Sequence, residues 1–498
     1  MNAKALAVMG WALLALAAQA RDWTDIAATP FVDPLLARPP VLDVGKVLPG
    51  DSQVHPCASA QDIDLAHALS LANVVDIALC RNPQVQSAWA SIKVQAAALG
   101  EAKAAYLPTF SAGVSRTRDR TRYPDSAFTE TSTVANSMYN TLSWRILDFG
   151  GRAANRQSAN ALLDAALASH DATLQKILST VVAAYFDAQT TKATLLAKQN
   201  SESIAQQTLA TAKRREEHGA GSQSDTLQAT TALAKTRLDK SRAQGVYAKA
   251  LSVLVYTLGL PVSTDTSAVT LTEDLMDSES ELHQELSAWL SQARENHPAV
   301  LAAKAQLESA KQKLKATRSE GLPTIDMTYN LYRNGRPNQG LTPNTLETLT
   351  GFTLNLPFFD GFSRTYKVSG AEAQIEVQEA QLRDVQNQVL SEVVKAHADA
   401  LAALNNLTAA QELLTAAQNA LASVQRKYDK GAADILEMLT TQTTLSDANQ
   451  QRIATLADWR SARLRLLAST GMLGHSGVAS SSQKVPPNPK PSEGAALP

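Results

Sequence analysis

The chain has 498 residues, of which 44% are hydrophobic, 19% charged and only 5% aromatic. A formal net charge of -1 argues against a nucleic-acid-binding protein. An apolar content supplied mainly by Ala, Leu and Val predicts helix–helix seams rather than one large globular core.

Residues 1–20 have the features of a secretory signal peptide. Lys4 supplies positive charge, residues 5–17 are apolar, and Ala18-Gln19-Ala20 is an A-x-A site, so we expect cleavage before Arg21. The alternative, an N-terminal membrane anchor, would need a longer apolar stretch. No cysteine follows the site, which argues against a lipoprotein signal. Because no later stretch approaches the ~20 apolar residues of a transmembrane helix, we expect any membrane passage to use strands.

The segments that flank the main body have no hydrophobic period. Residues 21–64 are rich in proline and predict an extended N-terminal arm, whereas residues 474–498 are rich in Ser and Pro and predict a disordered tail. The chain has two cysteines, Cys57 and Cys80. Export to an oxidising compartment favours a disulfide between them, and two free buried thiols are the alternative.

The main body is a duplication, with a first repeat over residues 65–285 and a second over residues 286–473. The motifs that recur are Arg81-Asn82-Pro83 with Asn296-His297-Pro298, Leu107-Pro108-Thr109 with Leu322-Pro323-Thr324, Asp148-Phe149-Gly150-Gly151-Arg152 with Asp360-Gly361-Phe362-Ser363-Arg364, and Glu217-His218-Gly219-Ala220 with Asp429-Lys430-Gly431-Ala432. The last two pairs share an offset of 212 residues. Each repeat is therefore expected to hold a helix, two strands, a long helix and a further helix.

A heptad seam predicts a very long helix in the second repeat. Apolar residues alternate at spacings of four and three along it: Val389, Val393, Ala396, Ala400, Ala403, Leu407, Ala410, Leu414, Ala417, Leu421, Val424 and Tyr428. The 67 residues from Arg364 to Lys430 would extend about 100 Å as straight helix. The first repeat carries the same seam, interrupted at Thr191, Lys198 and Glu202. We expect these helices to pack as left-handed coiled coils against helices near 221–258 and 434–470.

Apolar and polar residues alternate in four short stretches, at about residues 110–115, 142–146, 324–331 and 352–358. Apolar-out and polar-in alternation is typical of an outer-membrane barrel, and a soluble hairpin with one buried face is the alternative. The polar stretches 123–133 and 333–347 are expected to be the turns at the outer surface. Four strands cannot close a barrel around a lumen, so the chain is expected to oligomerise.

Over Leu65 to Leu473 these motifs resemble the TolC family of outer-membrane efflux and secretion channels. The resemblance implies a mainly α protein with a small β part. In that fold a homotrimer forms one outer-membrane β-barrel from four strands per chain, continued by a long periplasmic α-helical barrel. Helices near 65–105 and 289–320 would complete the tunnel, and 261–284 would belong to a collar around it. The implied partners are outer-membrane lipid, a periplasmic adaptor (membrane fusion) protein, and an inner-membrane ABC exporter or proton-driven pump.

The resemblance also places a gate at the two turns between long and short helices, marked by Gly219, Gly221 and Gly431. In the family, acidic rings line the aperture at the second turn. The matching positions are Glu437 and Thr440, so one acid is kept and one is lost, and Asp434 is a possible substitute. The inter-coil latch of the family maps to Asp225 and Tyr428. The family's latch arginine is replaced by Ala433. For Glu437 the alternative is an ordinary solvated helix face.

Enzymatic functions are disfavoured, and no cofactor or metal is expected. The eight histidines include no pair at i, i+4, and Gly219-Ala220-Gly221-Ser222 lacks the context of a phosphate loop. A periplasmic structural coiled coil would explain the helices but not the strands. Among channels, type I secretion of a protein competes with small-molecule efflux. The absent lipoprotein cysteine, the Cys57/Cys80 pair and Ala78-Leu79-Cys80-Arg81-Asn82-Pro83 resemble type I secretion members of the cyclolysin exporter type.

Overall fold

A computed structural model describes residues 33–39, 68–122, 124, 131–261, 269–272, 285–336, 345–430 and 432–471. The predicted signal peptide, most of the arm and the tail lie outside these residues, as do Cys57, Gly431 and most of the two predicted outer turns. None of the helices in the described ranges combines the length and the apolar character needed to cross a membrane.

The two repeats have helices of identical length. In chain order the first contains α4 (Leu71–Arg81), α5 (Pro83–Ala104), β1 (Thr109–Thr121), β2 (Thr131–Leu147), α6 (Gly151–Glu217) and α7 (Gln223–Thr257). The second contains α8 (Leu286–Asn296), α9 (Pro298–Ser319), β3 (Thr324–Arg333), β4 (Leu346–Asn355), α10 (Ser363–Asp429) and α11 (Ile435–Ser469). The long helices α6 and α10 each have 67 residues, and α7 and α11 each have 35.

The helix that leads into each strand pair is divided in two, because proline cannot continue a helix. Asn82 separates α4 from α5, and its Oδ1 accepts a hydrogen bond from the Gln84 backbone N–H at 2.9 Å. His297 separates α8 from α9, and its Nδ1 accepts from the Ala299 backbone N–H at 3.2 Å. The chain just after a returning helix passes close to each break: a Cβ at Gly259 would lie 2.7 Å from the Arg81 carbonyl oxygen, and one at Gly471 would lie 2.7 Å from Pro298 Cδ.

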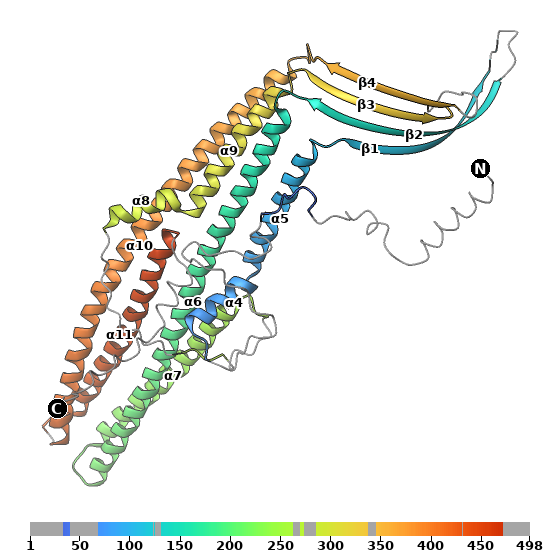
Figure 1. Ribbon diagram of the computed structural model, residues 1–498. Helices are drawn as coiled ribbons and strands as arrows, with labels where there is room; N and C mark the ends of the chain where they lie inside the picture. Colours follow the sequence, from blue (N-terminus) through green and yellow to red (C-terminus); the bar gives the residue numbers. More distant parts are fainter. Residues whose placement is uncertain are drawn as a thin grey trace, which may run out of the picture.

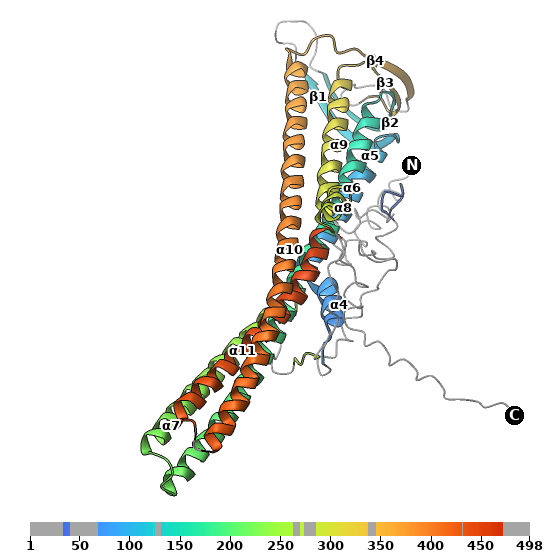
Figure 2. The same cartoon turned by 90° about the vertical axis from the view of Figure 1, so that its left-hand side faces the viewer.

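The predicted seam lies inside the helix pairs. On α10, Val393 and Ala400 are fully buried, and all twelve seam positions are buried or half-buried. On α6 the equivalent positions Val181 and Ala188 are at most 1% exposed. Helix α6 packs on α7 and α10 packs on α11, which gives two coils, here called coil one (α6 with α7) and coil two (α10 with α11). The two hairpin turns lie at the far end from the strands (Figures 1 and 2).

The four strands form one antiparallel sheet in the order β1-β2-β3-β4, which extends away from the helices (Figure 1). The register separates its faces. Phe110 pairs with Leu142 and Leu142 pairs with Tyr329 on the apolar face, whereas Ser111 pairs with Thr141 and Thr141 with Asn330 on the polar face. The alternation is therefore confirmed. Strand β4 ends at Asn355, earlier than predicted, because Pro357 has no N–H to donate to a ladder.

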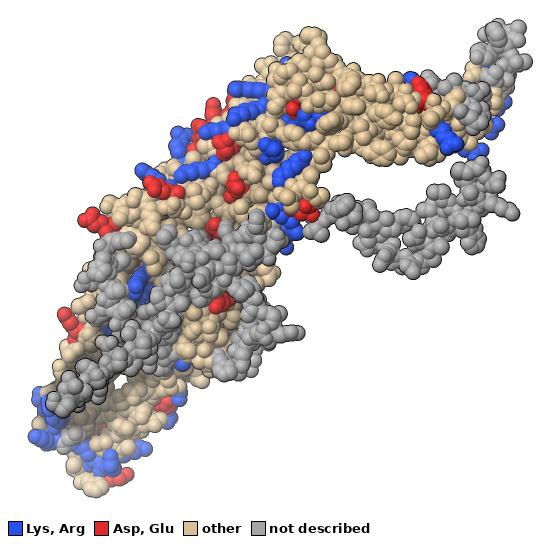
Figure 3. All heavy atoms as spheres, viewed as in Figure 1, with Lys and Arg blue, Asp and Glu red and all other residues tan. Residues whose placement is uncertain are grey.

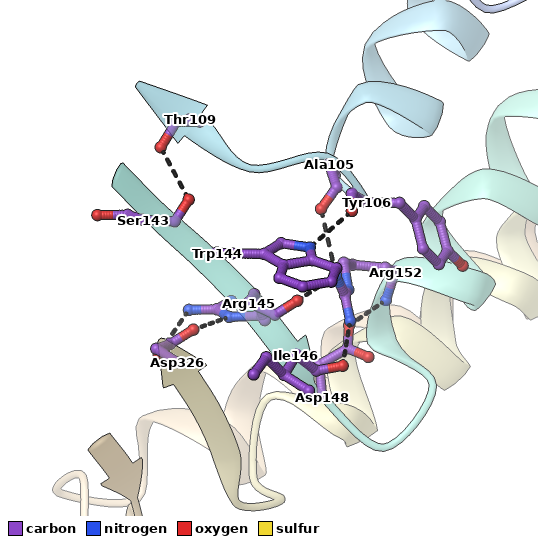
Figure 4. Close-up of polar contacts among 10 residues, drawn as sticks. All are labelled: Ala105, Tyr106, Thr109, Ser143, Trp144, Arg145, Ile146, Asp148, Arg152 and Asp326. Atoms are coloured by element: carbon purple, nitrogen blue, oxygen red, sulfur yellow. Dashed lines mark hydrogen bonds and ion pairs between the residues drawn. The ribbon is translucent and has the colours of Figure 1, made fainter. Parts of the chain in front are cut away.

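A half-buried polar corner joins β2 to α6 (Figure 4). Asp148 Oδ2 accepts from the Arg152 backbone N–H at 2.6 Å and lies 3.2 Å from Arg152 Nε. The Arg152 guanidinium donates to the carbonyl oxygens of Arg145 at 2.7 Å and Ile146 at 3.1 Å, and stacks 4.9 Å from the Tyr106 ring centroid. The guanidinium thus binds the last carbonyls of the strand while the carboxylate caps the helix.

The second repeat builds its corner with the same atoms. Asp360 Oδ2 accepts from the Arg364 backbone N–H at 3.0 Å, and Arg364 donates to the Pro357 carbonyl at 3.0 Å. Left-handed backbone closes both turns, at Phe149 (φ 49°), Gly150 (φ 95°), Gly361 (φ 66°) and Phe362 (φ 64°). The recurring Asp and Arg of the sequence motifs are therefore explained by one strand-to-helix corner.

The largest apolar core surrounds the middle of α6, where α4, α7 and the segment at Leu271 meet it. Tyr185 is fully buried there, with its hydroxyl 3.4 Å from Thr272 Oγ1. Leu69 and Leu271 form a parallel bridge that joins the start of the first repeat to the predicted collar. The remainder of that collar segment lies mostly outside the described residues.

Candidate gate and channel surface

The turn that closes coil one is set by two glycines and a capping box. Gly219 has φ +71°, a conformation that side chains rarely adopt, and a Cβ at Gly221 would lie 3.1 Å from Arg215 Cβ. Ser222 Oγ accepts from the Asp225 backbone N–H, and the Asp225 carboxylate accepts from the Ser222 backbone N–H at 3.1 Å. Asp225, the third residue of α7, therefore caps the start of this helix and also occupies the predicted latch position.

The turn that closes coil two presents the three predicted aperture residues on one side of α11. Asp434 is the N-cap of this helix, and its Oδ1 accepts from the Glu437 backbone N–H at 2.7 Å. Asp434, Glu437 and Thr440 are all exposed, at a spacing of three residues. Between them, Ile435 and Met438 are buried in the cluster that contains Tyr428. The helix thus packs with one face and leaves the acidic face in solvent.

Arg215 joins coil one to coil two at this end of the molecule. Its guanidinium donates from Nη1 to the Tyr428 carbonyl at 2.9 Å, and its Cζ lies 4.8 Å from the centroid of the Tyr428 ring. Tyr428 is only 5% exposed. The sequence analysis did not single out Arg215. The available signal was weak, since basic residues in the last turn of a helix are common.

Further polar contacts follow the same coil–coil interface away from the turns. Gln442 Nε2 donates to Thr208 Oγ1 at 3.0 Å, and Ser201 Oγ lies 3.3 Å from Ser446 Oγ. Lys198, one of the residues that interrupt the α6 seam, acts at this interface, with its Nζ 3.4 Å from Ser446 Oγ. Glu202, another of them, acts within coil one, where it accepts from Lys240 of α7 at 3.0 Å. The hydrogen bond from Lys240 is the main reason that the pKa of Glu202 is lowered.

At the other end of the molecule, the polar face of the sheet carries cross-strand side-chain pairs. These are Ser115 with Ser137 at 2.6 Å, Thr141 with Asn330 at 2.9 Å, and Arg145 with Asp326 at 2.8 Å. Arg145 and Asp326 project toward each other at the base of the sheet (Figure 4). In an oligomeric barrel this face would line the lumen.

No group of three or more metal-ligating side chains occurs within the described ranges. The structure places the predicted gate residues at the two turns, and it brings Tyr428 together with Arg215. No finding tests the predicted contact of Tyr428 with Asp225, so it stays a prediction. Gly431 and Cys57 lie outside the described residues, and the Cys57–Cys80 disulfide also stays a prediction.

The sequence matches the family described as outer membrane efflux protein over residues 74–260 and 289–472, which are the two repeats. It is 33% identical to protein CyaE of Bordetella pertussis over 444 residues, 89% of this chain and 91% of that protein. It is 21% identical to outer membrane protein TolC of Escherichia coli over 78% of this chain and 79% of that protein.

Solved outer-membrane channels have the same fold. The CmeC channel of Campylobacter jejuni superposes with a TM-score of 0.71 at 17% identity, covering 83% of this chain and 89% of that one. The MtrE channel of Neisseria gonorrhoeae gives a TM-score of 0.66 at 19% identity, covering 88% and 97%. The fold is that of a trimeric outer-membrane β-barrel with four strands per chain, continued into the periplasm by a helical tunnel.

The predicted fold class, location and non-enzymatic transport function are thus confirmed, and the structural coiled coil without a channel is excluded. Channels of this kind work as trimers with adaptor proteins and inner-membrane pumps or transporters. The chain belongs to the outer membrane efflux protein family of TolC-like channels, as the outer-membrane component of a tripartite export system.

Proposed function

We propose that this channel passes a secreted protein from an inner-membrane ABC exporter to the outside, as in type I secretion. The observation that carries the proposal is the 33% identity to CyaE over 89% of the chain, against 22% to nodulation protein T of Rhizobium leguminosarum and 21% to TolC. The segment Ala78-Leu79-Cys80-Arg81-Asn82-Pro83 also resembles type I secretion channels. Small-molecule efflux is the competing use, and the family description supports it.

We also place the gate of this channel at the two hairpin turns, between α6 and α7 and between α10 and α11. Three copies of Glu437 would form an acidic ring around the trimer axis, with Asp434 and Thr440 beside it on the same exposed side of α11. Such a ring attracts cations and repels anions. Two contacts would hold the coils inward: Arg215 with Tyr428 in the same chain, and the predicted Asp225 latch. An adaptor protein that binds the tip would have to separate them.

The two uses predict different consequences when the gene is deleted. If the channel secretes a protein, cells without it should lack one or a few proteins in the culture medium, and their drug sensitivity should be unchanged. If the channel serves efflux, cells without it should secrete the same proteins as before and become sensitive to several small molecules. Both quantities should be measured in the same strains, with the deletion complemented by the wild-type chain and by a variant that cannot assemble.

The inner-membrane partner gives an independent test. In cells, chemical cross-linking followed by mass spectrometry of the purified trimer should recover an adaptor and an ABC exporter. Recovery of a proton-driven pump, together with unchanged protein secretion, would overturn the secretion proposal and leave the channel fold unaffected.

A further inference from the structure

The two repeats meet inside the chain along one interface, here called the repeat interface. It consists of α6 packed on α9 and of β2 paired with β3. In the half of the molecule next to the strands, the helices therefore follow the order α5-α6-α9-α10, and the strands follow the order β1-β2-β3-β4 (Figure 1). Helices α5 and α10 are the two ends of this row.

The repeat interface buries one face of each of its two helices. The α6 residues of that face are all buried: Gly151, Ala154, Ser158, Ala161 and Ala165. The α9 residues recur every three or four positions and are buried or half-buried: Ala302, Ala305, Ser309, Gln312, Ala316 and Ser319. The packing is close and antiparallel. Ser158 Oγ lies 2.9 Å from Ser309 Oγ, and a Cβ at Gly151 would lie 2.6 Å from Ser319 Oγ.

The equivalent faces of α5 and α10 are exposed in the single chain. Because α5 begins at Pro83 and α9 at Pro298, their equivalent residues differ by 215 positions, and those of α6 and α10 differ by 212. The equivalents on α5, here called the α5 face, are all exposed: Ser87, Ala90, Val94, Ala97, Glu101 and Ala104. The equivalents on α10, here called the α10 face, are exposed as well: Ser363, Tyr366, Gly370, Ala373 and Val377.

Gly370 and Val94 are the equivalents of the two serines that meet at the repeat interface. Val94 is 63% exposed, and a Cβ at Gly370 would have no heavy atom within 4 Å. A glycine inside a helix is destabilising relative to alanine, and Gly370 does not have the left-handed backbone that would require one. A valine side chain packed directly on a bare Cα would account for both residues, since the glycine makes room for the larger partner.

The strands give an independent check on this equivalence. Inside the chain Leu142 pairs with Tyr329, and the same offsets make Leu354 of β4 and Val114 of β1 the equivalent pair. Both residues lie on the apolar face and are exposed, at 57% and 80%. A shift of one residue would instead have placed an apolar side chain opposite a polar one. Few charged side chains appear over the middle of the sheet (Figure 3), so this register continues an apolar band from one copy to the next.

We propose that the interface between copies repeats the interface between repeats: the α5 face of one copy packs on the α10 face of the next, with Val94 against Gly370. The two faces are different surfaces, so the contact is head-to-tail and closes into a ring. The trimer itself follows from the fold, and the proposal assigns the residues and the register that close it.

The two interfaces differ at their centre, which keeps them from being exchanged. The serines of the repeat interface bond to each other, and Ser158 Oγ also lies 3.2 Å from the Ser309 carbonyl oxygen. Opposite Val94 or Gly370 a serine would be buried without its side-chain partner, which is unfavourable. The chain should therefore pair its own repeats first and present α5 and α10 to other copies.

Disulfide cross-linking of the intact trimer in detergent tests the contact. The variant Val94→Cys/Gly370→Cys places two thiols where side chains of similar size meet at the repeat interface. Mild oxidation should link most chains into covalent dimers and trimers on a non-reducing denaturing gel. Each single variant should remain monomeric on that gel, which controls for the native Cys57 and Cys80. The register control Val94→Cys/Val377→Cys moves one thiol by a heptad, about 10 Å, which is too far for a disulfide, and should also remain monomeric.

A size exchange tests the same pair without thiols. Gly370→Val would put two valines in one space and should lower the trimer yield in native mass spectrometry roughly tenfold, because overpacking is destabilising. Adding Val94→Gly moves the side chain to the opposite helix and should restore the trimer. The matched control is Ser369→Val, since its equivalent Gln157 stays exposed beside the buried Ser158. This control should assemble like wild type.

The cross-linking decides the proposal even if Gly370→Val fails to fold. If the double-cysteine chain does not form trimers, Ala90→Cys/Ala373→Cys replaces it, one turn along the same two faces. Trimers that do not cross-link at these positions, or that cross-link equally in the register control, would overturn the proposal. Normal assembly of Gly370→Val would overturn the fit of Val94 on Gly370.

Discussion

Replacement of Arg215 should open the channel at rest. Arg215→Gln removes the stacking on the Tyr428 ring and the charged hydrogen bond to the Tyr428 carbonyl, both of which join coil one to coil two. A cation–π contact contributes about 0.5–2 kcal/mol, and a hydrogen bond to a charged group about 1.5–3 kcal/mol. Because Arg215 is half-exposed, we take about 1–2 kcal/mol for the two together.

The trimer multiplies this contribution. If the three copies open together, the loss is about 3–6 kcal/mol, which changes the ratio of closed to open channels by roughly two to four orders of magnitude. Single-channel recordings in planar bilayers should show this as a higher resting conductance. The matched control is Arg214→Gln, which removes the same charge from the same turn but affects hydrogen bonds within its own helix, to the Ala210 carbonyl and to Thr211 Oγ1.

A second variant separates the Arg215 contact from the predicted Asp225 latch. Tyr428→Phe keeps both the ring and the carbonyl that Arg215 binds, but it removes the hydroxyl that the latch requires. A closed Tyr428→Phe channel beside an open Arg215→Gln channel would assign the closure to Arg215. The reasoning fails if Arg215→Gln trimers conduct like wild type, or if Arg214→Gln opens the channel equally.

Three further predictions concern other parts of the chain. Glu437→Ala should reduce cation preference and block by multivalent cations in the same recordings, and unchanged selectivity in normal trimers would remove Glu437 from the aperture. Burial lowers the pKa of His297, so its contribution to stability is complete above about pH 6.5 and is lost as the pH falls through that value toward the folded-state pKa. His297→Asn, which copies Asn82 of the first repeat, should keep the helix cap and flatten this part of the pH dependence of thermal unfolding. Thiol labelling of denatured, unreduced protein should find no reactive cysteine if Cys57 and Cys80 pair, and two per chain would refute the disulfide.

The duplicated plan was predictable because its signals are periodic and occur twice. The seam from Val389 to Tyr428 repeats every seven residues, and the α10 that results differs from the predicted helix by one residue at each end. The strands were predictable in type from alternation, but not in extent. Strand β2 begins at Thr131, inside a stretch predicted as a turn, because threonine and serine pair across a sheet as readily as apolar residues do.

The candidate site was only partly predictable, since its contacts join residues that are remote in sequence. Glu437 and Asp434 could be placed by counting from a turn. Arg215 could not, because its partner Tyr428 lies 213 residues away.

The difference between the two seams shows how the copies have diverged in role. Helix α6 packs against α4, α5 and α7 of its own repeat and also against α9 and α11 of the other, whereas the main partners of α10 are α8, α9 and α11 of its own repeat. The polar residue Lys198 interrupts the α6 seam at the level where Lys198 and Ser201 contact Ser446 of coil two. Polar groups at seam positions fix register at some cost in stability. On α10 the seam is uninterrupted, and apolar residues one heptad apart, Val394 and Leu401, are 44% and 43% exposed in the single chain. Since the fold is trimeric, we expect the next copy to cover this side of α10. We therefore expect α10 to make contacts both within its own chain and with the next copy.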